Sequence, residues 1–284
     1  MQVTILGTGK MGGAMARRLA GAGFRLKLWN RTRSKAEALR LGEVADTPAQ
    51  ATMDSDVVIS MLTSPDALRA VYLSGAGAVQ AAQGQVFLEM STVGPEAVSE
   101  VAEVIEARGG ILADAPVLGS VPAVEAGQLT ILLGGEPAAL GRAKPVLQAL
   151  GEVRHVGPLG SGARLKLVAN SMLAGTGALA AELLAAGTRA GLPRDDIFWA
   201  LARMVPYLKA RERGYMEGVH EPVLFRLADM VKDLDLALSM YRESGAEAPL
   251  IEESRRLYAE TAEQSGELDL SAIIEHYQKP TRVA

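Results

Sequence analysis

The sequence contains no cysteine, so it can form no disulfide and offers neither a thiolate nucleophile nor a cysteine ligand for a metal. Asparagine is nearly absent too, since only Asn30 and Asn170 occur in 284 residues. Histidine occurs three times, as His155, His220 and His276, and none of the three falls in a motif that indicates catalysis. If the protein transfers protons, the acid or base is therefore expected to be a different kind of side chain.

A marked excess of one charge is also missing, since 29 basic and 33 acidic residues leave a net charge of −4. This balance does not favour a nucleic acid or an anionic membrane as a partner. We find no uninterrupted apolar run long enough for a membrane span. The first apolar run begins at Val3, which leaves no room for a signal or transit peptide. These features predict a cytoplasmic protein that acts on a small molecule and has no metal site.

A glycine pattern follows the first predicted strand, Val3–Leu6, and precedes a helical pattern that continues to Ala20. Gly7, Gly9 and Gly12 have the GxGxxG spacing of a dinucleotide-binding turn. In such a turn the first glycine permits the tight bend, the second lets the backbone approach a pyrophosphate and the third lets the helix pack closely. The N–H groups and the dipole at the helix N-terminus favour the phosphate charge. The pattern therefore predicts a nucleotide cofactor.

The second predicted strand, Leu26–Trp29, ends where an NAD-binding protein usually has a carboxylate for the ribose 2′-hydroxyl. The next residues include no carboxylate: they are Asn30, Arg31, Thr32 and Arg33. Arginine can hold a 2′-phosphate through paired charge-assisted hydrogen bonds, whereas a carboxylate would repel it. We therefore expect NADP(H). NAD(H) is the alternative cofactor, and a solvated basic turn is the alternative interpretation.

The first 160 residues alternate short apolar runs with helical patterns. Further strands are expected at 56–62, 85–90, 110–114 and 129–133, with helices at 95–108 and 137–150. This alternation predicts an α/β fold with a mainly parallel, doubly wound sheet of the Rossmann type. Ligands of such sheets bind beyond the carboxyl ends of the strands. The motif residues expected there are Gly7, Asn30, Thr63, Ser91, Thr92 and Asp114.

Strand patterns stop after about residue 163, and the rest of the chain is predicted to be helical. One long helix rich in alanine and leucine is expected at 163–191, followed by helices at 194–205, 222–243, 247–264 and 270–277. We therefore expect a Rossmann-type domain at residues 1–162 and an all-α domain at residues 163–284. A long apolar helix is difficult to bury in so small a domain, which favours a homodimer or homotetramer.

Lys166 and Asn170 lie at the start of this long helix, just after the turn Gly157–Gly162. Because they are four residues apart, they point from the same helical face. An amine beside an amide on an otherwise apolar helix indicates an acid–base group with a polar neighbour. A chance polar pair on an exposed helix end is the alternative interpretation.

Five motifs occur in a fixed order along the chain. They are Gly7–Gly12, Ser91–Pro95, Asp114–Val117 followed by Gly127–Ile131, Gly157–Asn170 and Lys232–Ala237. Together they resemble the β-hydroxyacid dehydrogenase family, which includes 3-hydroxyisobutyrate dehydrogenase and the reductases of tartronate semialdehyde, glyoxylate and succinic semialdehyde. The resemblance extends over nearly the whole chain.

The resemblance implies roles for individual residues. Lys166 resembles the family's catalytic lysine, and Asn170 resembles the neighbour that orients the substrate. Thr92 and Lys232 resemble contacts to the nicotinamide end of the cofactor, and Gly119 lies where the family binds the substrate carboxylate through its backbone. The expected cofactor-binding residues are Gly7, Thr8, Gly9, Lys10, Met11, Gly12, Asn30, Arg31, Thr32, Arg33, Met61, Leu62, Thr63, Thr92 and Lys232. The expected substrate residues are Ser91, Leu118, Gly119 and Ser120.

One position departs from the family pattern Asp-Ala-Pro-Val-Ser-Gly-Gly. Leu118 stands where a serine is expected, and a hydroxyl appears instead at Ser120. This difference bears on the contact to the substrate carboxylate and on substrate identity. The run Gly119–Ala123 is closer to the glyoxylate/succinic semialdehyde branch.

The expected reaction interconverts a small carboxylate-bearing aldehyde, such as glyoxylate or a semialdehyde, with its hydroxy acid, such as 3-hydroxyisobutyrate or 4-hydroxybutyrate. Lys166 is the expected acid/base. Because a solvated lysine has a pKa of about 10.4, apolar neighbours such as Leu165 and Leu167, or a second cation such as Lys232, are expected to lower it.

Two alternatives differ from this reaction. One is an imine reductase on the same scaffold, and the other is a cofactor-binding protein without turnover. Imine reductases usually replace the catalytic lysine, and a protein without turnover is expected to have lost Lys166 or Asn170; both residues are present. Asp114 precedes Ala-Pro at a strand end, so we expect it to brace a loop rather than to react.

Overall fold

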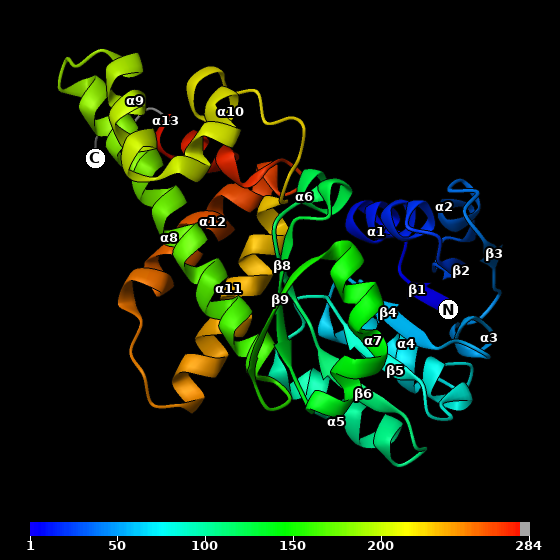
Figure 1. Ribbon diagram of the computed structural model, residues 1–284. Coiled ribbons are helices and arrows are strands. Elements are labelled where there is room, and N and C mark those ends of the chain that lie inside the picture. Colours follow the sequence, from blue (N-terminus) through cyan, green and yellow to red (C-terminus); the bar gives the residue numbers. More distant parts are fainter. Residues whose placement is uncertain (279–284) are drawn as a thin grey trace. The chain divides into compact units, whose positions relative to one another are not determined.

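The computed structural model describes residues 1–278, apart from the side chains of residues 137–140 (Figure 1). The chain divides into two compact units. The first comprises Met1–Lys166, and the second begins at Leu167.

A mixed, mostly parallel sheet forms the centre of the first unit. Its strands are β1 Gln2–Leu6, β2 Arg25–Trp29, β3 Glu43–Val44, β4 Val57–Ser60, β5 Val86–Glu89, β6 Ile111–Asp114, β7 Val117–Leu118, β8 Leu129–Gly134 and β9 Gly151–Gly157. They follow the order β3-β2-β1-β4-β5-β6-β8-β7, and β9 pairs with β8. The ladders from β3 to β6 are parallel, β8 runs antiparallel to β6 and β7, and β9 is parallel to β8.

Helices lie on both faces of this sheet, because successive strand residues are buried on opposite sides. Val57 and Ile59 belong to one apolar cluster, which also contains residues of α1 (Lys10–Gly21) and α7 (Pro137–Leu150). Val58 belongs to a second cluster with residues of α4 (Pro65–Leu73) and α5 (Pro95–Glu106). The remaining helical segments of this unit are short: α2 Arg33–Glu37, α3 Pro48–Thr52, η1 Ala78–Ala81 and α6 Val121–Ala126.

The second unit is helical. Its segments are α8 Ser161–Arg189, which starts in the first unit, α9 Arg194–Met204, η2 Pro206–Arg211, α10 Glu212–Glu217, α11 Leu227–Glu243, α12 Pro249–Ser265, η3 Leu270–Ile273 and α13 Ile274–Gln278. Within residues 167–278 the only β pairing is an isolated bridge between Arg226 and Asp269. Small side chains of α8, including Ala174 and Ala181, are fully buried in a core shared with Leu234 of α11 and Tyr258 of α12. The predicted fold class, a Rossmann-type sheet domain followed by an all-α domain, is therefore confirmed.

Three local predictions need correction. Strand β9 was not expected, because its polar residues alternate with apolar ones at an exposed sheet edge. The helix expected at 222–243 begins only at Leu227, and the segment before it is bent, with Phe225 O accepting a hydrogen bond from Leu270 N of η3. The helix expected at 270–277 is a 3₁₀ turn followed by α13.

Helix α8 is long and apolar enough to cross a membrane by length and composition, and it alone among the described residues meets this test. This test allows charged residues within the window, so it identifies a helix that contains no uninterrupted apolar run of that length. The finding is weak evidence for a span, because the core helix of a folded domain passes the same test and half of the apolar window is buried.

Candidate active site

The glycine turn after β1 has the geometry that a dinucleotide requires. Gly7 has φ +99°, and a Cβ there would lie 2.4 Å from the Met61 carbonyl oxygen. A Cβ at Gly12 would lie 1.9 Å from the Gly7 carbonyl oxygen, so α1 packs as closely as only glycine allows. By contrast, a Cβ at Gly9 would meet nothing within 4 Å. The turn is therefore tight on its protein side and open at Gly9, where the backbone can approach a phosphate.

The residues beside Gly9 also fit a phosphate group. Gly9 is the N-cap of α1 and supplies no capping side chain, and the first turn of α1 contains no acidic residue. The buried Thr8 hydroxyl has no hydrogen-bond partner among the described residues. Lys10 and Met11 begin the helix at this point, exposed and half-buried respectively. N–H groups, a hydroxyl and a lysine thus surround the helix N-terminus, which is a donor set that suits an anion.

The loop after β2 is connected directly to this turn. Asn30 accepts a hydrogen bond from Thr8 N at 2.9 Å and donates to Thr32 O at 3.0 Å. Arg31 and Thr32 are exposed, and Arg31 makes no ion pair or hydrogen bond with the described residues. Arg33, in contrast, is ion-paired with Glu37 at 2.7 Å and also with Asp46. Of the two arginines, Arg31 is thus the one whose guanidinium is not engaged by a carboxylate.

The loops after β4 and β5 are joined by a hydrogen bond. Leu62 N donates to Ser91 Oγ at 2.7 Å, and Met61 N donates to Leu6 O at 2.9 Å. Ser91 is 4% exposed, so its hydroxyl lies inside the unit rather than at its surface. Thr63 is exposed and Thr92 is half-buried. The first unit therefore brings these residues, the glycine turn and Asn30 to the carboxyl ends of neighbouring parallel strands.

The predicted carboxylate-binding segment follows β7. Gly119 has φ +127°, and a Cβ there would lie 2.9 Å from Leu129 Cδ2. Leu118 belongs to β7 and pairs with Thr130. Ser120 precedes α6 as its N-cap, yet its hydroxyl caps no backbone group of that helix. Gly119 is exposed and Ser120 is half-buried.

Asp114 holds the first turn of α8, as the sequence indicated. Its Oδ1 accepts a hydrogen bond from Gly160 N at 2.7 Å, and its Oδ2 accepts one from Ala163 N at 2.6 Å. A Cβ at Gly162 would lie 2.9 Å from Oδ2. Burial raises the pKa of Asp114, and these backbone donors oppose the shift. Asp114 thereby fixes the start of the helix that carries Lys166.

Lys166 and Asn170 both lie in α8, four residues apart as predicted, with Lys166 half-buried and Asn170 buried. Nδ2 of Asn170 donates to Oδ2 of Asp233 in α11. Oδ1 of Asp233 lies 2.7 Å from Nζ of Lys232, and the Asp233 side chain is 1% exposed. A carboxylate only accepts hydrogen bonds, so it fixes the orientation of the Asn170 amide. Sequence reasoning missed Asp233, although the residue directly follows Lys232 in a motif that was identified.

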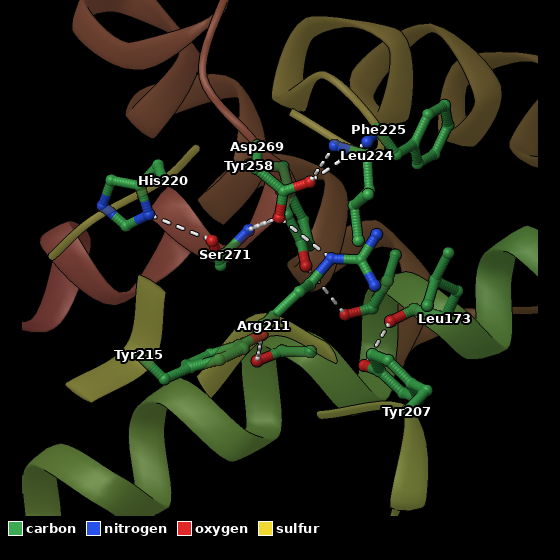
Figure 2. Close-up of polar contacts among 12 residues, drawn as sticks. Leu173, Tyr207, Arg211, Tyr215, His220, Leu224, Phe225, Tyr258, Asp269 and Ser271 are labelled. Carbon is green, nitrogen blue, oxygen red and sulfur yellow. Dashed lines mark hydrogen bonds and ion pairs between the residues drawn. The ribbon is translucent and has the colours of Figure 1, made fainter. Parts of the chain in front are cut away.

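A second buried carboxylate fixes the segment that enters α11 (Figure 2). Asp269 accepts hydrogen bonds from Arg211 Nε, Leu224 N and Phe225 N at 2.9–3.0 Å, and from Ser271 N at 3.1 Å. The same figure shows His220 beside Ser271, with Nδ1 3.0 Å from Oγ.

The histidines have structural surroundings. His220 also pairs with Glu275, His155 contacts Gly135 O at 2.9 Å, and His276 packs edge-on against Tyr277. None of these contacts involves a predicted site residue.

The fold and the glycine turn define a dinucleotide-binding protein. A model of the NAD-binding domain of 6-phosphogluconate dehydrogenase matches residues 2–158. A second model, described as the NAD-binding region of NADP-dependent 3-hydroxyisobutyrate dehydrogenase, matches residues 160–277. The chain belongs to the 3-hydroxyisobutyrate dehydrogenase family of β-hydroxyacid dehydrogenases, and it is an NAD(P)-dependent dehydrogenase or reductase.

Relatives extend over almost the whole chain. It is 32% identical to glyoxylate/succinic semialdehyde reductase 1 of Arabidopsis thaliana, with 97% of this chain and 98% of the relative covered. It is also 32% identical to 3-hydroxyisobutyrate dehydrogenase of Pseudomonas aeruginosa, with the same coverage. Among solved structures, Mycobacterium tuberculosis 3-hydroxyisobutyrate dehydrogenase with L-serine matches with a TM-score of 0.85 at 29% identity, covering 98% of this chain and 99% of that one.

Proposed function

We propose that the protein reduces a small aldehyde that carries a carboxylate, such as glyoxylate or a semialdehyde, to its hydroxy acid, and that it prefers NADPH. The observation that carries this proposal is a cluster of polar side chains on α8 and α11. Asp233 contacts both Asn170 and Lys232. Lys166 lies one helical turn before Asn170 on α8. The names of the Arabidopsis and Pseudomonas relatives support the substrate class.

Each residue has a distinct part in the proposed reaction. The bound dinucleotide supplies the hydride. Lys166 Nζ gives a proton to the oxygen of the aldehyde as that oxygen gains charge. One Nδ2 hydrogen of Asn170 is held by Asp233, and the other is left to donate to a substrate oxygen. Backbone N–H groups near Gly119 and the Ser120 hydroxyl, which caps no helix, are proposed to bind the carboxylate.

The preference for NADPH rests on Arg31. It is exposed beside Asn30, the residue that is tied to the glycine turn, and no carboxylate engages it among the described residues. Arg33 is held by Glu37 and Asp46 and is assigned the smaller part. A 2′-phosphate would give Arg31 a bidentate partner.

Oxidation of NADPH and NADH in the presence of four aldehydes tests the proposal. The panel is glyoxylate, succinic semialdehyde, methylmalonate semialdehyde and tartronate semialdehyde. The expected result is one clear substrate, with kcat/KM higher for NADPH than for NADH. If NADPH binds but none of the four is reduced, the proposed substrate class is wrong.

We also propose that the protein assembles as a homodimer or homotetramer through α8. Val168, Met172, Leu179 and Leu183 are spaced by four, seven and four residues, so they share one helical face, and Met172 is 67% exposed. An exposed apolar stripe of this kind marks an interaction surface. Light scattering should give at least twice the chain mass of 29.9 kDa, and the double variant Met172→Glu, Leu179→Glu should reduce it. A wild-type monomer would contradict this proposal.

A further inference from the structure

A fully buried carboxylate lies under the loops that follow β4 and β5. Glu89 is the last residue of β5 and is 0% exposed. Its Oε1 accepts a hydrogen bond from Ser91 N at 2.8 Å, and its Oε2 accepts one from the Ser60 hydroxyl at the end of β4. The Tyr72 hydroxyl in turn donates to Ser60 Oγ at 2.8 Å. Proton donors from β4 and from the loop after β5 thus converge on one carboxylate.

Ser91 transmits this arrangement to the loop after β4. Its Oγ accepts the hydrogen bond from Leu62 N at 2.7 Å, while its backbone N–H donates to Glu89 Oε1 at 2.8 Å. The two loops are therefore linked through one serine, whose backbone is held by the carboxylate beneath it. This also explains why Ser91, predicted as a substrate residue, has its hydroxyl engaged within the unit.

The acceptor has to be a carboxylate with both oxygens. One hydroxyl group and one backbone N–H group donate to Glu89, one to each oxygen, and a carboxylate that is ionised above its pKa of about 7 accepts at both oxygens. A glutamine of the same shape accepts at one oxygen only, and its NH₂ group would oppose one of these two donors. Burial of a charge without such donors would be strongly unfavourable.

We propose that Glu89 is a positioning residue, which holds residues 61–63 and 91–92 at the spacing that the nicotinamide end of the cofactor requires. The inference rests on the proposed function, since it takes those residues as cofactor contacts. The adenine end involves a different set, the glycine turn and Arg31, which Glu89 does not contact in the structure.

The test compares two ligands for the variant Glu89→Gln, with Kd measured by calorimetry at pH 8, above the Glu89 pKa of about 7. NADPH spans the whole site, whereas adenosine 2′,5′-bisphosphate occupies the adenine end only. We expect Kd for NADPH to rise by about tenfold, which corresponds to the loss of one charge-assisted hydrogen bond between the displaced loops and the cofactor. Kd for the fragment should change by less than about twofold. Tyr72→Phe keeps the ring but removes the donor to Ser60, and should give a smaller shift in the same direction.

Ser99→Ala is the matched control, because its hydroxyl donates within α5 to Pro95 O and touches neither loop. It should leave both Kd values unchanged. An unchanged NADPH affinity in Glu89→Gln, or an equal loss for both ligands, overturns the positioning role. If Glu89→Gln does not fold, the same comparison of the two Kd changes in Tyr72→Phe decides whether the positioning role holds. If the wild type binds neither ligand, the proposed function itself is wrong.

Discussion

Nδ2 of Asn170 donates a hydrogen bond to Oδ2 of Asp233, and this buried contact links α8 to α11. The other oxygen of Asp233 is paired with Lys232. One buried carboxylate therefore sets the positions of two residues that the family resemblance places in the active site.

Asp233→Asn should lower kcat/KM by at least about tenfold and the free energy of unfolding by about 1–3 kcal/mol. The new amide keeps the shape, but both of its neighbours are donors, so its own N–H groups must face one of them. Steady-state kinetics and urea unfolding measure the two effects. Asp235→Asn is the control, because Asp235 forms an exposed ion pair with Arg255, which is expected to contribute less than about 1 kcal/mol. Equal behaviour of the two variants would remove the special role of Asp233.

Arg31→Ala should weaken NADPH binding more than Arg33→Ala does. Losing a charge-assisted contact to a phosphate costs roughly 1.5–3 kcal/mol, or about ten- to a hundredfold in Kd. Arg33 already has two carboxylate partners, so its removal is expected to matter less. Fluorescence titration with NADPH and with NADH measures both effects, and Kd for NADH should stay unchanged in Arg31→Ala. The NADPH preference is not due to Arg31 if both cofactors weaken equally.

The stability of the protein should fall as the pH rises from about 5 to 8, and Glu89 should account for part of this fall. Burial raises the pKa of Glu89 to about 7, with Asp114, its partner on β6, adding to the shift and the donors from Ser60 and Ser91 opposing it. The folded state thus holds a proton that the unfolded chain has already released. The stabilisation is fully present below the pKa of the unfolded chain and is lost as the pH passes through 7.

Glu89→Gln does not titrate and isolates this contribution from that of Asp114, whose pKa burial also raises. Melting temperatures of both proteins from pH 5 to 8.5 give the comparison. The melting temperature of the wild type minus that of the variant should decrease as the pH rises. The decrease should correspond to roughly 1–3 kcal/mol in the free energy of unfolding. A difference that is flat, or that increases with pH, contradicts the assignment.

The repeating patterns of the chain were sufficient to predict most of the fold. The buried strands and α8 have long, uniform apolar signals, and the glycine turn has a fixed spacing. Strand β9 escaped prediction because an edge strand exposed on one side has no continuous apolar run. The start of α11 depends on hydrogen bonds between Asp269 and residues 224–225, which are more than forty residues away in the chain.

In the candidate site, too, the features with a local sequence pattern could be predicted and those that depend on distant contacts could not. Lys166, Asn170 and the glycine turn are recognisable because their spacing along the chain is local. Other features of the site arise from contacts between separate elements. They are the ion pair of Arg33 with Asp46, the hydrogen bonds of Asp114 to the start of α8, and the donors that meet at Glu89. No local pattern contains that information, so these features required the structure.

Replacement of Lys166 by alanine tests the central claim most directly. With the aldehyde identified by the panel, kcat of Lys166→Ala should fall by about 10²–10⁴-fold, the usual contribution of a general acid, while Kd for NADPH changes by less than about twofold. Arg164→Ala, which removes an exposed cation from the same part of α8, serves as the control and should keep its turnover. Turnover of Lys166→Ala close to that of the wild type would show that another group supplies the proton.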